Sequence, residues 1–519
     1  MSKNYFRPRW TCGRYNSEHR VAIYYNLIEG VSYLFEDDSA DIIGELLLVP
    51  RDGCFSLEGL AEKTDTAIES LTPFLDTLTE CNLIIDAPVT SSGINAYRKA
   101  VAEFKCSQSQ AMVKTTKDKL PLDVSSAEMD YMERVGGITS VMLELTYDCS
   151  ERCIHCYNIG ATRNDSEKSH RLDREELTLN DYRRIIDELY EQGLVKVCLS
   201  GGDPFQKSFA WDIIDYLYQK GVAFDVYTNG LRLGGKTQHL ADYFPRLVAV
   251  SIYSGRAEEH DGITRIRGSW EKSMTVVREL SALAVPMNLK CCIMRPNVKH
   301  YFEVADLARQ YGALAQFEVN ITDSIDGDRC ARENLRLPVE MMEIVLRDDN
   351  VSLYVGEEAP NFGGQPRRMD INACGAGYNS FCITPEGNLI ACCAFHASFG
   401  NLKRQALEDI LRDSEDLSQW RSMTLNDYKD CGRHDYCDYC NLCPGNNFTE
   451  HGNPTFAAEN NCYLAKVRHG LAIKMMRGYD PLQGMTLRER LGGLPDYEKV
   501  TLKREYSHDY SDKSLTAGG

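Results

Sequence analysis

The sequence predicts an α/β protein whose centre is a partial (β/α)6 TIM barrel, flanked by a smaller N-terminal unit and a cysteine-rich C-terminal region. Three observations lead to this prediction. Strand and helix periodicities alternate six times between Val141 and Ile321. A hairpin pattern and three helix patterns precede them, between residues 21 and 86. Finally, nine of the 20 cysteines lie between residues 374 and 462.

Length and composition narrow the class of protein. At 519 residues, with 43% apolar residues, the chain has material for about three globular domains. No apolar run approaches the ~18 residues of a membrane helix, and Met1 to Asn16 lacks the apolar core of a secretory signal. We therefore expect a cytoplasmic protein without a membrane partner. The formal net charge of −18 argues against nucleic acid as a partner.

The N-terminal unit begins with two strand patterns, Val21 to Leu27 and Val31 to Phe35, joined by a turn at Glu29-Gly30. Helix patterns follow over 41–48, from Ser56 and over 67–78, and a short strand over 83–85 closes the unit. Pro73 lies inside the third helix pattern and predicts a kink or a later start. Residues 101 to 138 lose this periodicity and predict a linker, with a helix near 129–134.

The barrel comes next, over 139–335. Its six strand patterns are Val141–Tyr147, Val195–Leu199, Ala223–Thr228, Val248–Tyr253, Leu289–Met294 and Phe317–Ile321. Helix patterns fit between them, for example over 270–283 and 298–311. Chemistry in such barrels is found at the carboxyl ends of the strands.

Three cysteines, Cys149, Cys153 and Cys156, follow the first barrel strand directly. Thiolates at this spacing can hold one face of an iron–sulfur cube, and three ligands for four irons leave one iron open for chemistry. The alternatives are half of a structural zinc site, or buried thiols that behave as small apolar residues.

This segment resembles the radical S-adenosylmethionine (SAM) enzymes, and His155 with Tyr157 beside the third cysteine looks like the branch that matures peptides. The resemblance implies a [4Fe–4S] cluster that chelates SAM, a 5′-deoxyadenosyl radical that takes a substrate hydrogen, and an external electron donor such as flavodoxin or ferredoxin. It also implies SAM-binding residues on the later strands: Gly201, Gly202, Asp203, Pro204, Thr228, Asn229 and Ser251. Taken alone, a Gly-Gly-Asp-Pro run is more often a simple tight turn.

Other barrel cysteines carry weaker signals. Cys198, Cys291 and Cys292 lie within strands and are expected to be core or wall residues. Cys330, beyond the sixth strand, is either a hydrogen-atom donor or a passive thiol. The sequence assigns no catalytic base.

The C-terminal cysteines resemble the SPASM domain, which holds auxiliary iron–sulfur clusters in radical SAM peptide maturases. The resemblance implies ligands among Cys374, Cys392, Cys431, Cys437, Cys440, Cys443 and Cys462, for two further [4Fe–4S] clusters. A hairpin over 383–392 would bring Cys374 and Cys392 together, while Cys382 and Cys393 are either ligands or bystanders. The spacing of Cys437, Cys440 and Cys443 departs from the commoner pattern, and the alternative is a zinc knuckle.

The N-terminal hairpin with its three helices resembles the winged-helix module called a RiPP recognition element, which captures the leader of ribosomally made, post-translationally modified peptides (RiPPs). An exposed strand edge can pair with an extended peptide. A winged helix for DNA or for domain packing is the alternative, and the acidic run Glu36-Asp37-Asp38 disfavours DNA.

These patterns together predict a peptide maturase that oxidatively cross-links a precursor peptide, with a thioether as the first option. The alternatives are carbon–carbon or carbon–oxygen cross-linking, epimerisation, or a peptide-binding protein that holds clusters or zinc without turnover. The predicted domains are a recognition element (1–100), linker (101–138), radical SAM barrel (139–335), bridging region (336–373), SPASM domain (374–476) and polar tail (477–519).

Overall fold

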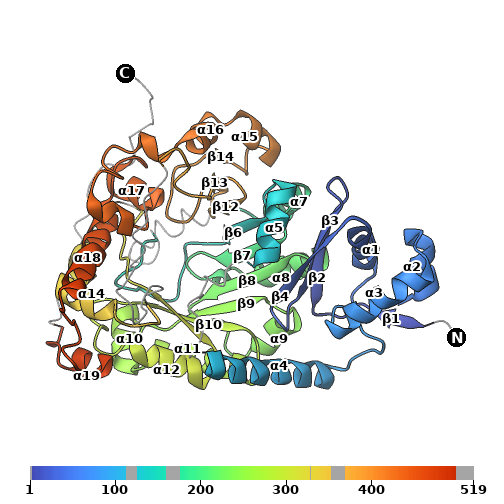
Figure 1. Ribbon diagram of the computed structural model, residues 1–519, viewed down its shortest axis with the longest axis horizontal. Coiled ribbons are helices and arrows are strands. Elements are labelled where there is room, and N and C mark those ends of the chain that lie inside the picture. Colours follow the sequence, from blue (N-terminus) through green and yellow to red (C-terminus); the bar gives the residue numbers. More distant parts are fainter. Residues whose placement is uncertain are drawn as a thin grey trace.

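A parallel sheet forms the centre of the computed structural model (Figure 1), which describes residues 3–112, 125–158, 176–325, 327, 329–351 and 369–497. Nine strands pair in the order β11-β10-β9-β8-β7-β6-β12-β13-β14. The six predicted barrel strands are β6 (Ser140–Glu144), β7 (Lys196–Ser200), β8 (Ala223–Thr228), β9 (Leu247–Ser251), β10 (Met287–Cys292) and β11 (Leu314–Glu318). All five pairings among them are parallel, and the predicted fold class is confirmed.

Helices cover the outer face of this sheet. They are α7 (Leu179–Glu191), α8 (Ala210–Lys220), α9 (Thr237–Asp242), α10 (Ala257–Thr264), α11 (Ser269–Ala282) and α12 (Phe302–Gln310). Alternate strand residues such as Leu143, Val197 and Val250 face them and belong to the main hydrophobic core. The residues at the intervening strand positions face the other side of the sheet, and several of them are polar. Glu144 pairs with Ser200, and Ser251 pairs with Lys290. The inner face of the sheet is therefore built for polar contacts.

The N-terminal unit contains a three-stranded antiparallel sheet, β2 (Thr11–Asn16), β3 (Val21–Asn26) and β4 (Val31–Glu36). A small second sheet joins β1 (Asn4–Phe6) to β5 (Cys54–Ser56), and the helices are α1 (Asp37–Leu48), α2 (Leu57–Thr64) and α3 (Ile68–Glu80). The predicted hairpin is present, but β2 adds a strand that the sequence did not reveal. Pro73 lies inside α3, which runs unbroken from Ile68.

The predicted linker is largely helical. It contains the end of α4 (Ser91–Met112) and all of α5 (Ser126–Val135), where Tyr131 is fully buried; residues 113–124 lie outside the described part. Tyr131 shares a hydrophobic cluster with Ile23 of β3 and with Val195 and Ala223 at the start of β7 and β8. The N-terminal unit therefore packs against the amino ends of the barrel strands. The helix predicted near 129–134 is present as α5, whereas the helix α4 was not predicted.

The C-terminal region continues the barrel sheet. Its first strand, β12 (Ser380–Ile383), pairs in parallel with β6, and β13 (Asn388–Ile390) and β14 (Gly400–Asn401) follow antiparallel. The predicted hairpin turn is present at Gly387, which has a φ of 88°. The remaining helices are α13 (Cys330–Leu335), α14 (Val339–Val345), α15 (Leu407–Asp413), α16 (Glu415–Ser422), α17 (Pro444–His451), α18 (Glu459–Met476) and α19 (Leu487–Gly492).

The bridging region and the polar tail both contain helices. The bridging region contains α14, and its residues 352–368 lie outside the described part. The predicted polar tail contains α19, where Leu491 is fully buried and Arg488 pairs with Asp306 at 2.6 Å. Because these contacts fix α19 on the barrel helices, the start of the tail is part of the fold; residues 498–519 lie outside the described part. Among the residues that the structure describes, no helix has the length and apolar character needed to cross a membrane.

Candidate functional site

The three-cysteine loop lies at the carboxyl end of β6. Cys153 is 8% exposed, and the Cys156 N–H donates to the Cys153 carbonyl at 3.2 Å. The Cys149 sulfur accepts two hydrogen bonds, from the Glu151 N–H at 3.4 Å and from the Asn229 Nδ2 at 3.2 Å. Donors aimed at a sulfur stabilise its thiolate form, which is the form that binds iron.

Burial acts in the opposite direction on these thiols. It raises the pKa of Cys149 to about 12, and it raises the pKa of Cys153 well above the ordinary range. The charges of Glu151, Cys156 and Cys149 raise the pKa of Cys153 further. A positively charged metal centre would reverse this balance, because metal binding to thiols releases their protons.

The Gly-Gly-Asp-Pro segment follows β7 and packs against the start of the cysteine loop. A Cβ atom on Gly201, whose φ is +123°, would lie 2.3 Å from the Thr146 oxygen, and one on Gly202 would lie 2.3 Å from the Asp148 oxygen. Only glycine fits at both positions. The sequence predicted a close approach to a ligand; the structure shows, in addition, a close approach to the protein's own loop.

Asp203 ties the neighbouring strand ends together. Its buried carboxylate accepts from the Thr228 hydroxyl at 2.6 Å and from the Asn229 N–H at 3.0 Å, and Pro204 begins a short 3-10 helix directly after it. The Asn229 side chain then reaches Cys149 on the adjacent loop. The structure thus brings four predicted residues, Cys149, Asp203, Thr228 and Asn229, from the ends of β6, β7 and β8 into one hydrogen-bonded assembly.

Ser251 ends β9 at the same edge of the sheet, and an aromatic stack lies next to it. The rings of His155 and Tyr253 are 4.6 Å apart, edge to face, and Tyr253 stacks on His260 at 5.6 Å. Burial lowers the pKa of His155 to about 4, so this imidazole is neutral at pH 7. His155 therefore supports the loop as a packed aromatic residue.

The barrel cysteines divide between the two faces of the sheet. Cys291 belongs to the outer hydrophobic core, as predicted. Cys198 pairs with Met142, and Cys292 pairs with Glu318, which places both on the polar inner face as wall residues. Cys330 begins α13 and accepts a weak contact from the Asn334 amide at 3.5 Å.

Sequence reasoning missed three polar residues of the inner face. Glu144 at the end of β6 is fully buried, and burial raises its pKa to about 8. The Lys290 ammonium lies 3.4 Å from the ring centroid of Tyr227. Polar residues at alternate positions inside otherwise apolar strands were the signal that could have found them.

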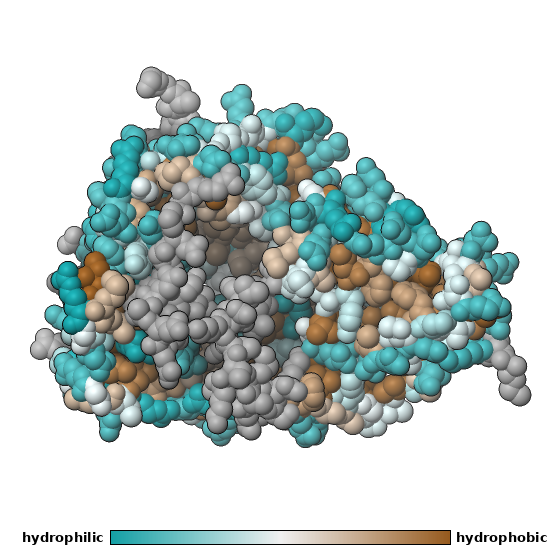
Figure 2. Space-filling model, in the orientation of Figure 1, coloured by the Kyte–Doolittle hydropathy of each residue, from teal (hydrophilic) through white to brown (hydrophobic). Residues whose placement is uncertain are grey.

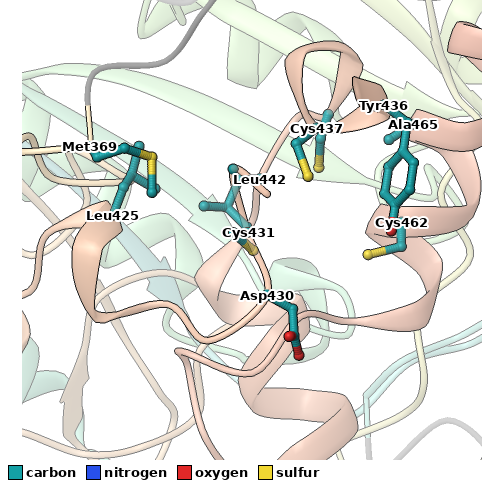
Figure 3. Close-up of a pocket in the computed structure, with 11 residues that line it drawn as sticks. Met369, Leu425, Asp430, Cys431, Tyr436, Cys437, Leu442, Cys462 and Ala465 are labelled. Atoms are coloured by element: carbon teal, nitrogen blue, oxygen red, sulfur yellow. The ribbon is translucent and has the colours of Figure 1, made fainter. Parts of the chain in front are cut away.

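Four of the predicted C-terminal ligands line one cavity, and we call Cys431, Cys437, Cys440 and Cys462 the cavity group. The cavity holds about 390 Å³ of space not filled by protein atoms, part of it open to solvent. Figure 3 shows the sulfurs of Cys431, Cys437 and Cys462 turned toward the same space. Cys440 lines the cavity from the same turn as Cys437.

The other three form what we call the hairpin group, Cys374, Cys392 and Cys443. Burial raises the pKa of Cys392, and the charges of Cys393, Cys443 and Cys374 raise it further. Backbone N–H groups point at two of the sulfurs, from Ala376 to Cys374 and from Asn446 to Cys443, both at 3.4 Å. Cys382 and Cys393 lie nearby, buried toward Glu144 and Tyr157.

These donor sets suit iron–sulfur clusters chemically, because every group consists of thiols and three of the sulfurs receive N–H donors. Among the described residues, no three His, Cys, Asp or Glu side chains are already closed around a single metal ion. The cysteine side chains would therefore turn inward when a cluster binds.

Comparisons with known proteins agree with this organisation. The model of the radical SAM superfamily matches residues 143–312, and that of the SPASM iron-sulfur cluster-binding domain matches residues 374–444. The "Mycofactocin maturase MftC" of Mycolicibacterium smegmatis is 28% identical over 388 residues, which cover 71% of this chain and 87% of the relative. The "Antilisterial bacteriocin subtilosin biosynthesis protein AlbA" of Bacillus subtilis is 22% identical over 327 residues, 62% of this chain and 70% of the relative.

A solved structure described as "Native anSMEcpe with bound AdoMet" has the same fold, with a TM-score of 0.50 and 13% identity over 66% of this chain and 98% of that one. The radical SAM match includes the three-cysteine loop, and the SPASM match includes every cysteine of the cavity and hairpin groups except Cys462. Residues 143–312 therefore form a radical SAM domain and residues 374–444 a SPASM domain, so the chain is an enzyme whose cofactors are SAM and [4Fe–4S] clusters.

Proposed function

We propose that this enzyme matures a ribosomally synthesised precursor peptide by oxidative cross-linking, with a thioether as its product. The observation that carries the proposal is the separation of the cysteines into a three-thiol loop on the barrel and two further groups behind it. Similar proteins named as a mycofactocin maturase, a subtilosin biosynthesis protein and a PqqA peptide cyclase support a peptide substrate.

In this proposal Cys149, Cys153 and Cys156 hold the cluster that binds SAM. Together these cofactors supply a 5′-deoxyadenosyl radical, which removes a hydrogen atom from the substrate. The Gly201-Gly202 backbone, Thr228, Asn229 and Ser251 would hold SAM at the strand ends, and Asp203 keeps Thr228 and Asn229 in place. Reducing electrons come from a cytoplasmic donor of the flavodoxin or ferredoxin type.

The hairpin and cavity groups hold the auxiliary clusters, which supply an acceptor for the electron that bond formation releases. Forming a thioether breaks one C–H and one S–H bond and makes one C–S bond. One hydrogen atom leaves to the deoxyadenosyl radical, and the thiol hydrogen leaves as a proton and an electron. Lys290, Tyr227 and Glu144 line the inner face on which the reacting segment would lie.

The leader of the precursor would bind the N-terminal unit along β4. The Asp37 N–H donates to the carbonyl of Arg20, the residue before β3. Because main-chain groups along an antiparallel strand point alternately toward and away from the partner strand, those of Ser32 and Leu34 point away from β3. On one side of this edge, half-buried Phe35 packs edge-on against Phe74 of α3. Figure 2 shows hydrophobic residues gathered over α3 and the neighbouring strands. An added peptide strand would find hydrogen bonds on β4 and apolar contacts on α3.

Substitution of Ser32 tests the leader site. Ser32→Pro removes an outward N–H without removing a bond to β3, so we expect weaker precursor binding and unchanged peptide-independent cleavage of SAM. Ser32→Ala is the matched control, because it removes the contact to the Ser125 hydroxyl and keeps the N–H. Equal precursor affinity for both variants, measured by fluorescence anisotropy, would place the leader elsewhere.

Mass spectrometry of the precursor tests the reaction. A thioether predicts the loss of two hydrogens together with one cysteine that no longer reacts with iodoacetamide. The same loss with every cysteine still alkylated would indicate carbon–carbon or carbon–oxygen cross-linking instead. An unchanged mass with retained peptide binding would indicate either epimerisation or a binding protein, which deuterium incorporation from heavy water distinguishes.

A further inference from the structure

The two auxiliary cysteine groups are joined by a buried set of asparagine side chains between α17 and α18. Asn446 and Asn447 are 7% and 0% exposed, and Asn461 is 5% exposed. The Asn446 amide donates to the Asn461 side-chain oxygen at 3.1 Å, and the Asn461 amide donates to the Asn447 side-chain oxygen at 3.2 Å. Buried amides whose donors and acceptors are satisfied hold a single geometry.

Asn461 contacts both groups at once. Its side-chain amide donates to the backbone carbonyl of Cys443, in the hairpin group, at 3.2 Å. Its own backbone carbonyl oxygen lies 3.9 Å from the sulfur of Cys440, in the cavity group, and the next residue is Cys462. Asn446, which holds the other end of the Asn461 side chain, donates its backbone N–H to the Cys443 sulfur.

We propose that Asn461 is a positioning residue that fixes the two auxiliary cysteine groups relative to each other and sets the electrostatic environment of both. The proposal rests on the function proposed above, in which each group holds a cluster. Hydrogen bonds and net charge near the sulfurs set cluster potentials, so one residue that touches both groups influences both centres.

The structure offers a matched control in the preceding residue. Asn460 is 2% exposed, as buried as Asn461, but its side chain points to Asn320 at 3.5 Å and its N–H donates to Glu450. Asn461→Asp and Asn460→Asp therefore introduce the same charge at the same depth, and only the first replaces a group that contacts the cysteine segments.

The experiment uses full-length reconstituted protein that carries Cys149→Ala, Cys153→Ala and Cys156→Ala, so that only auxiliary signals remain. Redox titration followed by electron paramagnetic resonance should show both midpoint potentials lowered in Asn461→Asp, and lowered less in Asn460→Asp. Equal shifts in the two variants, or a shift of one centre alone in Asn461→Asp, would overturn the proposal.

A second variant covers the case in which Asn461→Asp does not retain iron. Asn461→Ala keeps the backbone carbonyl that meets Cys440 and removes the amide that meets Cys443. It should therefore shift the hairpin-group signal and leave the cavity-group signal near the parent value; the reverse pattern, or no shift, would contradict the proposal. The protein without a substitution at Asn461 distinguishes the cluster assignment from the role of Asn461. If it shows fewer than two auxiliary signals, the cluster assignment is refuted and the role of Asn461 is not.

Discussion

The cysteine loop on the barrel and the cysteines of the C-terminal region are assembled in different ways. The loop takes its three thiols from eight consecutive residues, held by glycines and by Asn229 from neighbouring strands. The cavity group takes four thiols from a turn and from α18, and the hairpin group takes three from separate segments. The ligands of the first site come from one short segment, whereas those of the other two sites come from segments that are brought together by folding.

Because of this difference, we expect the two regions to respond differently to the loss of a cysteine. The loop has no spare ligand, because three thiolates already leave one iron of a cube without a protein ligand. The C-terminal groups contribute no thiol to this loop, so damage to them should leave the SAM site intact. The predictions below test that independence.

The largest expected effect follows from Cys153→Ala. Two remaining thiolates cannot hold a cube with one open iron, so reductive cleavage of SAM should fall to background, and iron content should drop by about four per chain. Formation of 5′-deoxyadenosine under dithionite measures this. Cys198→Ala, a thiol of the inner face without a predicted ligand role, should cleave SAM like the parent. Substantial product from Cys153→Ala would place the radical site elsewhere.

Cys437→Ala should separate the two regions. Its side chain lines the cavity and is 8% exposed, so its loss should remove one auxiliary cluster, about four irons per chain. SAM cleavage without peptide should continue, while precursor modification should be abolished. Loss of both activities together would show that the regions are not independent.

Asn229→Ala should give an intermediate effect within the first region. It removes the amide that donates to the Cys149 sulfur, and partners of this kind are typically worth about 10- to 100-fold in metal affinity or activity. The rate of SAM cleavage and the iron retained under a chelator measure it. Ser273→Ala, which removes only the hydroxyl that supports the Asn229 carbonyl, should have a smaller effect. Equal effects would mean that the amide itself does not matter.

The smallest effect concerns stability at the end of β6. Burial raises the pKa of Glu144 from its usual 4.5 to about 8, so between these values the unfolded chain releases a proton that the folded chain keeps. Stability is therefore lost as pH rises through this window. Glu144→Gln should raise the melting temperature of the apoprotein more at pH 8 than at pH 5, by at most a few kcal/mol in unfolding free energy. Glu318→Gln, an exposed position, is the control.

The sequence was sufficient to predict the elements whose signals are local. The six barrel strands, the three-cysteine loop and the Gly201-Gly202 turn each carry their pattern within a few residues, and the structure contains all of them. The sixth strand begins three residues earlier than predicted, at Leu314 instead of Phe317. The strand Thr11–Asn16 was missed because Thr-Cys-Gly-Arg-Tyr-Asn lacks apolar alternation and depends on its partner β3. The helix Leu487–Gly492 was missed for a similar reason, since a single buried leucine fixes it.

The spacing of the C-terminal cysteines in the sequence did not predict which of them lie together. Cys437, Cys440 and Cys443 look like one knot in the sequence, but the structure puts Cys443 with Cys392. Cys443 is the residue before α17, and its side chain accepts the Asn446 N–H as the helix begins. The chain turns away from the cavity at that point, and only the tertiary arrangement reveals it.

The pairing of β12 with β6 also has a consequence for synthesis of the chain. Thr139 and Asn379, at the start of this pairing, are 240 residues apart, so the edge of β6 has no partner on that side until the ribosome has made the C-terminal region. At about 5–20 residues per second, the wait is roughly 12 to 48 s. During that time the nascent barrel presents an open strand edge to other chains. Slower translation should therefore increase aggregation of this enzyme, and a chain ending before Ser380 should aggregate even though its barrel strands are complete.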